Sequence, residues 1–186
     1  MHDPGSVLEA ARGALASLPP ILDAMLSDLD AAMARARPAA DEWAPVEILC
    51  HLRDEETEDF GARLRVVLDG GPEFAPIDPE GWVEARRYRE ADLGQVLDDL
   101  RQRRRASLDL LASIAPERLS NALAHRRLGQ LSGLDLLVAW VAHDRLHVAQ
   151  LAATLARLWA TRWAPLRAEY AGPIPYAPGA KTGWRP

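Results

Sequence analysis

Apolar residues recur at spacings of three and four along four stretches of the chain, a period that is typical of amphipathic helices. The stretches cover residues 6–34, 45–69, 93–114 and 133–159. There is almost no alternation of apolar and polar residues of the kind that indicates a half-buried strand. The pattern therefore predicts an all-α protein, a four-helix bundle in which each helix buries one face.

Prolines and glycines predict where these helices break. Pro19 and Pro20 lack the backbone donor that a helix interior needs, so we expect the first helix to bend or stop there. Residues 71–81 hold three prolines and two glycines, and a short helix is expected after them. A link as long as residues 71–91 permits a crossover between the second and third helices instead of a tight hairpin.

Two further segments lack clear periodicity. Residues 116–131 are predicted to be a connection with at most one helical turn. Residues 164–186 are rich in proline and glycine and are interpreted as a C-terminal tail that wraps the bundle or is disordered. The helical domain is therefore expected to cover residues 1–163.

Composition narrows the class of protein. A chain of 186 residues fits one domain, and its net charge of −5 argues against a nucleic-acid partner. The single cysteine, Cys50, excludes an internal disulfide framework. Charges interrupt every long apolar run, so no membrane span is expected, and the acidic N-terminus shows no signal-peptide pattern. We therefore expect a cytoplasmic protein.

The fourth helix carries the first candidate site. His143 and His147 stand four residues apart, so their side chains lie on one face of the helix and can share a metal ion. Both fall on a stripe that is apolar at Leu136 and Trp140 and should face the interior. Asp144 stands where a zinc protease with an H-E-x-x-H motif carries glutamate, so that template is not met. Ordinary hydrogen bonds inside a core are the alternative role for this pair.

The second helix offers a third histidine. If the second and fourth helices pack side by side, His51 can face His143 and His147. Three imidazoles with the remaining positions left open are typical of a catalytic metal site. Glu55 and Glu58 should follow His51 along its side of the helix. Glu55 is the candidate for a fourth ligand or an outer partner of the site, and the alternative is an exposed carboxylate.

The third helix carries a run of basic residues, Arg101, Arg103, Arg104 and Arg105. Asp98 and Asp99 precede Arg101 and Arg103 by three and four residues, at the spacing of helical ion pairs. We interpret the run as a solvated helix face, and the alternative is an anion-binding or nucleic-acid-binding patch.

Two motifs together resemble a known family. They are Trp43-x-Pro45-x-Glu47-x-x-x-His51-Leu52-x-Asp54-Glu55 and His143-Asp144-x-x-His147-x-x-Gln150. In this combination, over roughly residues 5–160, the chain resembles the DinB-like superfamily of four-helix-bundle metalloenzymes. The passage Phe74-x-Pro76-x-Asp78-x-Glu80-x-Trp82 resembles one branch of that family. Ala44 departs from the pattern, since the family usually has a Ser or Thr cap there.

The resemblance implies a metal site and a range of reactions. It implies that His51, His143 and His147 bind a divalent transition metal: zinc, nickel, iron or manganese. It also implies a small-molecule substrate, a homodimer and, by analogy with characterised relatives, transfer of a low-molecular-weight thiol to an electrophile. A metal lowers the pKa of a bound thiol and would equally activate water. A hydrolase on the same three histidines, and a non-catalytic stress-related bundle, therefore stay open as alternatives.

Overall fold

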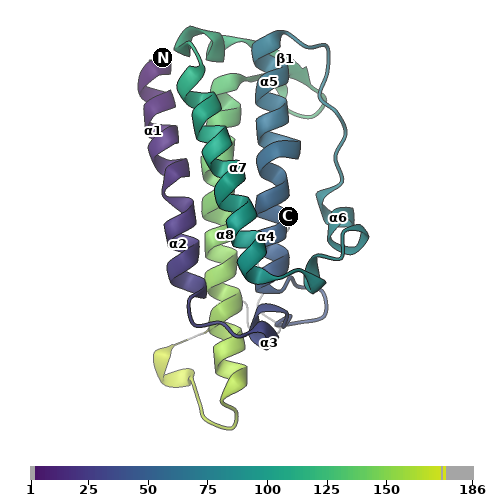
Figure 1. The fold of residues 1–186 in the computed structure, drawn as a ribbon, viewed down its shortest axis with the longest axis vertical. Coiled ribbons are helices and arrows are strands. Elements are labelled where there is room, and N and C mark those ends of the chain that lie inside the picture. Colours follow the sequence, from purple (N-terminus) through teal and green to yellow (C-terminus); the bar gives the residue numbers. More distant parts are fainter. Residues whose placement is uncertain (1–2, 173, 175–186) are drawn as a thin grey trace.

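Four long helical rods form the body of the protein in a computed structural model that describes residues 3–172 and residue 174 (Figure 1). The rods are α1 (Pro4–Ala16) with α2 (Leu18–Leu26); α4 (Pro45–Glu55) with the π-helical turn η1 (Glu56–Phe60) and α5 (Gly61–Asp69); α7 (Leu93–Ser113); and α8 (Gly133–Arg162). The smaller elements are α3 (Ala31–Ala34), α6 (Pro79–Ala85), η2 (Tyr88–Glu90), η3 (Pro116–Ser120), β1 (Ala122–His125), β2 (Gly129–Ser132) and η4 (Glu169–Ala171). The predicted all-α four-helix bundle is confirmed.

The boundary at residue 163 and the character of the tail stay predictions. Most of the predicted tail, residues 173 and 175–186, lies outside the described residues. No helix within the described part of the chain is long and apolar enough to cross a membrane.

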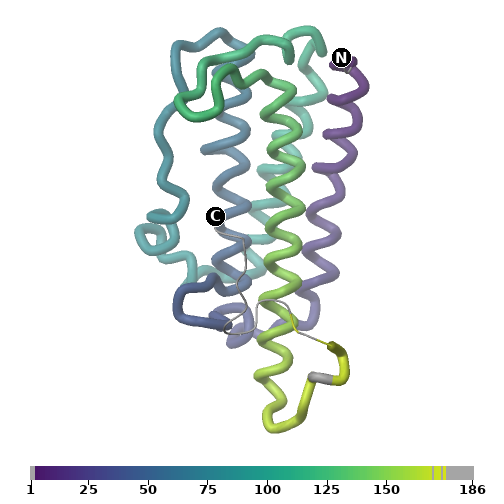
Figure 2. Tube along the Cα trace, turned by 180° about the vertical axis from the view of Figure 1, so that it is seen from behind, coloured from purple at the N-terminus to yellow at the C-terminus, as the bar shows by residue number. Residues whose placement is uncertain are grey.

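The predicted crossover is present between the second and third rods. Residues 70–92 run back along the outside of the bundle, so that α7 lies parallel to α4 (Figure 2). Asp54 of α4 fastens the crossover, because its carboxylate accepts hydrogen bonds from the Tyr88 hydroxyl at 2.7 Å and the Arg86 guanidinium at 2.7 Å. Burial raises the pKa of Asp54, but hydrogen bonds from Arg53, Tyr88 and Arg86 outweigh it and lower the pKa to about 2.

The connection at residues 116–131 is more ordered than the sequence predicts. It contains a two-stranded antiparallel hairpin in which Ala122 pairs with Ser132 and His125 with Gly129. Gly129 has φ +77°, a left-handed conformation that glycine adopts without strain. The strands are only four residues long and none of their residues is buried, so they are too short and too exposed to give a clear strand pattern in the sequence.

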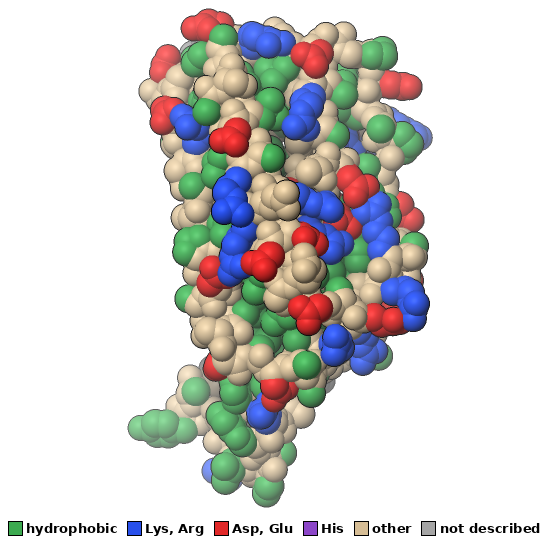
Figure 3. Space-filling model, viewed as in Figure 1, with side chains coloured by type: hydrophobic (Ala, Val, Ile, Leu, Met, Phe, Trp, Pro, Cys, Tyr) green, Lys and Arg blue, Asp and Glu red, His purple; other side chains and the backbone are tan. Residues whose placement is uncertain are grey.

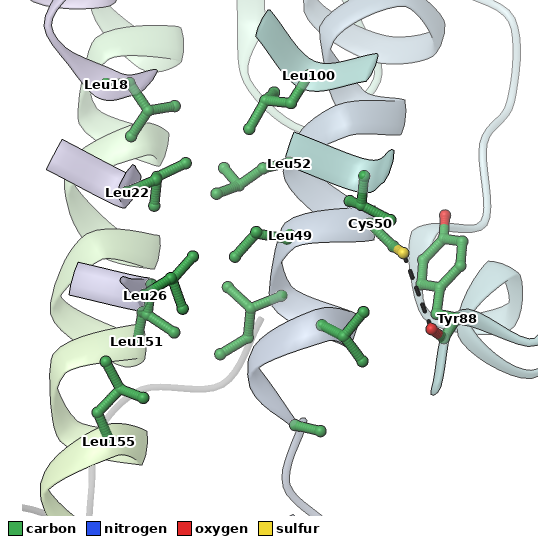
Figure 4. Close-up of a cluster of buried hydrophobic side chains, with 14 of the residues drawn as sticks. Leu18, Leu22, Leu26, Leu49, Cys50, Leu52, Tyr88, Leu100, Leu151 and Leu155 are labelled. Atoms are coloured by element: carbon green, nitrogen blue, oxygen red, sulfur yellow. Dashed lines mark hydrogen bonds between the residues drawn. The ribbon is translucent and has the colours of Figure 1, made fainter. Parts of the chain in front are cut away.

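The core divides into two apolar clusters with a polar layer between them. The first cluster contains Leu18, Leu22 and Leu26 of α2 against Leu49, Leu52, Leu100, Leu151 and Leu155 (Figure 4). The second cluster gathers Leu8, Leu15, Phe60, Leu64, Leu111, Leu137 and Trp140. Between them, along three of the rods, lie the residues that we call the polar layer: His51, Glu55, Glu56, Arg104, His143, Asp144 and His147. Cys50 is buried in the first cluster, as expected for a small core residue.

The second rod changes pitch inside the polar layer. The sequence predicts one continuous helix over 45–69, but η1 inserts a π turn at Glu56–Phe60, closed by the Gly61 backbone N–H on the Glu56 carbonyl. The additional residue turns the following side chains around the rod. Glu58 pairs with Arg86 of the crossover, at 2.6 Å, and its side chain is 40% exposed, so the expectation that it follows the buried His51 is wrong.

Replacing Gly61 with alanine should destabilise the protein. A Cβ at this position would lie 2.5 Å from the Glu56 carbonyl oxygen, so the π turn would have to shift, at a cost of about 1–3 kcal/mol. Gly13→Ala is the matched control, because nothing lies within 4 Å of a Cβ there and alanine favours a helix interior by up to about 1 kcal/mol. Urea unfolding should therefore shift in opposite directions in the two variants. A Gly61→Ala protein as stable as Gly13→Ala would contradict the steric argument.

Candidate metal centre

Three histidines from two rods converge in the polar layer. His51 projects from α4, and His143 and His147 project from the facing side of α8. The Nε2 atom of His143 lies 3.2 Å from Nε2 of His51 and 3.1 Å from Nε2 of His147. The structure therefore brings together the three residues that the sequence singles out.

The geometry of this cluster fits one metal ion. Zinc–imidazole bonds of about 2.0–2.1 Å in a tetrahedral arrangement place two ligand nitrogens about 3.3 Å apart. The observed separations of 3.1 and 3.2 Å are close to this value. One ligand atom from each of the three side chains falls within 4.8 Å of the others. Three imidazoles leave at least one coordination position open, as in catalytic sites.

The opposite ring nitrogens show how the rings are held. His147 Nδ1 lies 2.8 Å from the amide oxygen of Gln150, so it carries the proton and leaves Nε2 with its lone pair toward the cluster. The Nδ1 atoms of His51 and His143 are buried and have no hydrogen-bond partner among the described residues. These two atoms would carry protons if both Nε2 atoms bound a metal.

Glu55 lies beside the cluster, and the alternative of an exposed carboxylate is wrong, because Glu55 is only 4% exposed. One carboxylate oxygen is 3.9 Å from His51 Nδ1 and the other is 3.7 Å from His143 Nε2. The first approach suits an outer partner of a ligand and the second suits a group near the ion, so both predicted roles remain.

Burial sets the protonation of the site. It lowers the pKa of His51 to about 3, with a further contribution from His147, and lowers the pKa of His147 to about 4. It also lowers the pKa of His143 to about 2. Burial and the neighbouring Asp59 raise the pKa of Glu55. The three imidazoles are therefore neutral near pH 7, the form in which histidine binds a metal.

Two aromatic side chains line the cluster. The Trp43 ring is stacked on His147, with centroids 6.4 Å apart, and lies 5.0 Å from His51. The Phe60 ring lies 5.0 Å from His143, whose side chain is 19% exposed. The sequence pattern predicts that Trp43 is a core residue at a helix start, and only the fold shows that its ring packs against the histidine cluster.

The charged run on α7 is only partly the solvated face that the sequence predicts. Arg101 pairs with Asp98 as expected, and acidic and basic side chains are interspersed over this face (Figure 3). Arg103, however, contacts Asp54 at 3.1 Å. Arg104 is 1% exposed and binds Asp144, so the expectation of a solvated face is wrong for this residue. Its spacing of four from Leu100 and seven from Leu111, on the apolar stripe, is the signal that could have revealed its burial.

Residues 14–151 match the family model of the DinB superfamily. The chain belongs to the DinB superfamily. A search of curated proteins found no match. Among solved structures, the DinB-superfamily chain is similar to YfiT from Bacillus subtilis, described as a probable metal-dependent hydrolase with an unusual four-helix bundle topology. The TM-score is 0.73, with 18% identity over 82% of this chain and 87% of YfiT.

A second solved structure is TT2238, described as a four-helix bundle protein. It matches with a TM-score of 0.55 and 23% identity over 78% of this chain and 98% of that one. At these identities the two likenesses establish the fold alone.

The metal-free protein should lose stability as the pH falls from about 6.5 to about 5. Because burial lowers the folded-state pKa of each site histidine, the unfolded chain binds more protons in this range, and each histidine contributes a slope of about 1.4 kcal/mol per pH unit. Glu55 acts in the opposite direction, since its folded-state pKa is raised. His143→Gln should flatten the slope of unfolding free energy against pH by one histidine's share. An unchanged slope in that variant would mean that His143 is not held neutral.

Proposed function

We propose that this member of the DinB superfamily is a metal-dependent enzyme whose divalent ion is bound by His51, His143 and His147. The observation that carries the proposal is the convergence of three imidazoles, neutral near pH 7, on a single point. The description of YfiT as a probable metal-dependent hydrolase supports it. The candidate ions are zinc, nickel, iron and manganese, because imidazole ligands suit several divalent transition metals.

A bound ion of this kind would act as a Lewis acid that lowers the pKa of a thiol or a water and so supplies a nucleophile near neutral pH. Other residues of the chain orient the ligands and cover the cluster. Gln150 holds the His147 ring through Nδ1, while Trp43 and Phe60 cover two sides of the cluster. Glu55 is close enough to His143 Nε2 to accept a proton from the nucleophile, and its raised pKa suits that task.

The proposed reaction is transfer of a low-molecular-weight thiol to a small electrophilic substrate. It rests on the resemblance of the two histidine motifs to relatives that use such thiols. The second candidate is hydrolysis on the same site, with water as nucleophile, and it is favoured by the likeness to YfiT. We extend the proposal to a homodimer located in the cytoplasm, and the homodimer rests on the family resemblance.

His143→Ala should abolish stoichiometric metal binding. Elemental analysis of untagged protein should find about one equivalent of a transition metal in the wild type and almost none in the variant, because two imidazoles alone form a weak site. His125→Ala is the matched control, since His125 belongs to the hairpin and its Nδ1 accepts from the Arg127 and Leu128 backbone. A metal-free wild type that also fails to take up zinc, nickel or manganese would favour the non-catalytic alternative.

The metal-loaded protein should consume a small electrophile only when a low-molecular-weight thiol is present. The thiol is the proposed nucleophile, and its pKa falls on the metal. Product analysis with and without thiol, on activated esters and on alkylating electrophiles, separates the two reactions. Turnover of activated esters without thiol would instead identify a hydrolase. In either case His143→Ala should reduce the rate to background and His125→Ala should not.

A further inference from the structure

Arg104 forms the centre of an ion network that the metal site itself does not use. Its guanidinium lies between Glu56 of η1 and Asp144 of α8, and all three side chains are nearly inaccessible to solvent. The network belongs to the polar layer, at the level where each rod changes from the first apolar cluster to the second.

Every N–H of the guanidinium is used. Nε and one terminal nitrogen bind the two oxygens of Glu56, each at 2.8 Å. The two terminal nitrogens bind the oxygens of Asp144 at 2.7 and 3.0 Å. The fifth donor reaches the backbone carbonyl of Leu15 at 2.8 Å. Two bidentate pairs and one carbonyl fix the position and the plane of the group, a geometry that lysine could not reproduce.

A proline in the sequence makes the fifth acceptor, the Leu15 carbonyl, available. In an uninterrupted helix the Leu15 carbonyl would accept from the backbone N–H of residue 19, but that residue is Pro19 and has none. The break between α1 and α2 therefore leaves the Leu15 carbonyl without its usual helical donor, and the Ser17 backbone N–H and the Arg104 guanidinium donate to it instead. The network consequently joins all four rods of the bundle.

The two acids of the network are sequence neighbours of the site. Asp144 comes directly after His143 in α8. Glu56 comes directly after Glu55, which itself lies one helical turn after His51. Successive residues of a helix point about 100° apart, so each pair presents one side chain to Arg104 and the other to the histidine cluster. A single guanidinium thus links the rod that carries His51 to α8, which carries His143 and His147.

We propose that Arg104 is a positioning residue for the three-histidine centre, a role that rests on the metal-binding function proposed above. Buried ion pairs often contribute less to stability than apolar side chains of similar volume, and in some proteins their role is to fix geometry. A metal ion needs that geometry, because its ligand nitrogens must stay close to the separations of 3.1 and 3.2 Å seen here.

The test separates geometry from stability. Arg104→Met alone would leave two buried carboxylates unpaired and could prevent folding. The main variant is therefore the uncharged triple change Arg104→Met, Glu56→Gln and Asp144→Leu, which keeps an acceptor for the Trp140 indole N–H that binds Glu56. Arg104→Lys is the second variant, because it retains the charge but not the two bidentate pairs. Arg101→Gln is the matched control on the same helix, since it breaks the partly exposed pairs with Asp23 and Asp98 and does not touch the polar layer.

Cobalt(II) is the probe, read by its visible absorption bands and by competition for its Kd. The triple variant and Arg104→Lys should fold, bind cobalt at least about tenfold more weakly than the wild type and show altered bands, whereas Arg101→Gln should match the wild type. Unchanged affinity and bands in either folded Arg104 variant would overturn the proposal.

A measurement on the metal-free protein keeps this proposal distinct from the metal-binding function. NMR contacts between the ring protons of His51 and His143 should be present in the wild type and weakened in the folded Arg104 variants. A wild type that binds no metal would defeat the proposed function alone, and the ring contacts would still decide the role of Arg104. Contacts of equal strength in wild type and variants would show that the histidines hold their places without it.

Discussion

Five N–H donors of one buried guanidinium must find five acceptors in the middle of this bundle. Arginine keeps its proton when it is buried, so it cannot avoid the cost of burying a charge by becoming neutral. A donor without an acceptor would therefore carry a large desolvation cost. The break between α1 and α2 leaves the buried Leu15 carbonyl free to accept from Arg104. The start of η1 supplies Glu56, and α8 supplies Asp144. Features that look unrelated in the sequence, a Pro-Pro pair, a π turn and an acid beside a histidine, meet at this group.

The two apolar clusters on either side of the polar layer supply the stability that offsets the cost of burying its polar groups. Leucines of all four rods form the first cluster, and Phe60, Trp140 and their neighbours form the second. Each cluster excludes water, which lowers the pKa of the three histidines and strengthens the pairs around Arg104. The helices are stabilised by the clusters, and the layer between them is available for chemistry.

Sequence periodicity predicts the helices and places His143 and His147 on one helix face, because both depend on regular helical spacing. The length of the link at residues 71–91 permits the crossover, and His51 is expected to meet the other two histidines only if the second and fourth helices pack side by side, as they do. It fails where a contact distant along the chain decides the outcome. The π turn needs a glycine at residue 61 only because the Glu56 carbonyl approaches it, and this close approach leaves no trace in the apolar pattern. The same holds for Arg104, because a charged residue inside a basic run indicates a surface position until the three residues that supply its acceptors are known.

The acid in the His143-Asp144 pair illustrates how helix geometry distributes roles. In an H-E-x-x-H site the acid beside the first histidine acts as a base, but here Asp144 is fully engaged by Arg104. A base for the proposed reaction must then come from the opposite rod, where Glu55 lies 3.7 Å from His143 Nε2. Ligands and base would thus sit on different helices, and their separation would depend on the packing of α4 against α8. We propose that the guanidinium of Arg104 controls this distance, so a residue that looks purely structural would act on the chemistry through the ligands and the base that it positions.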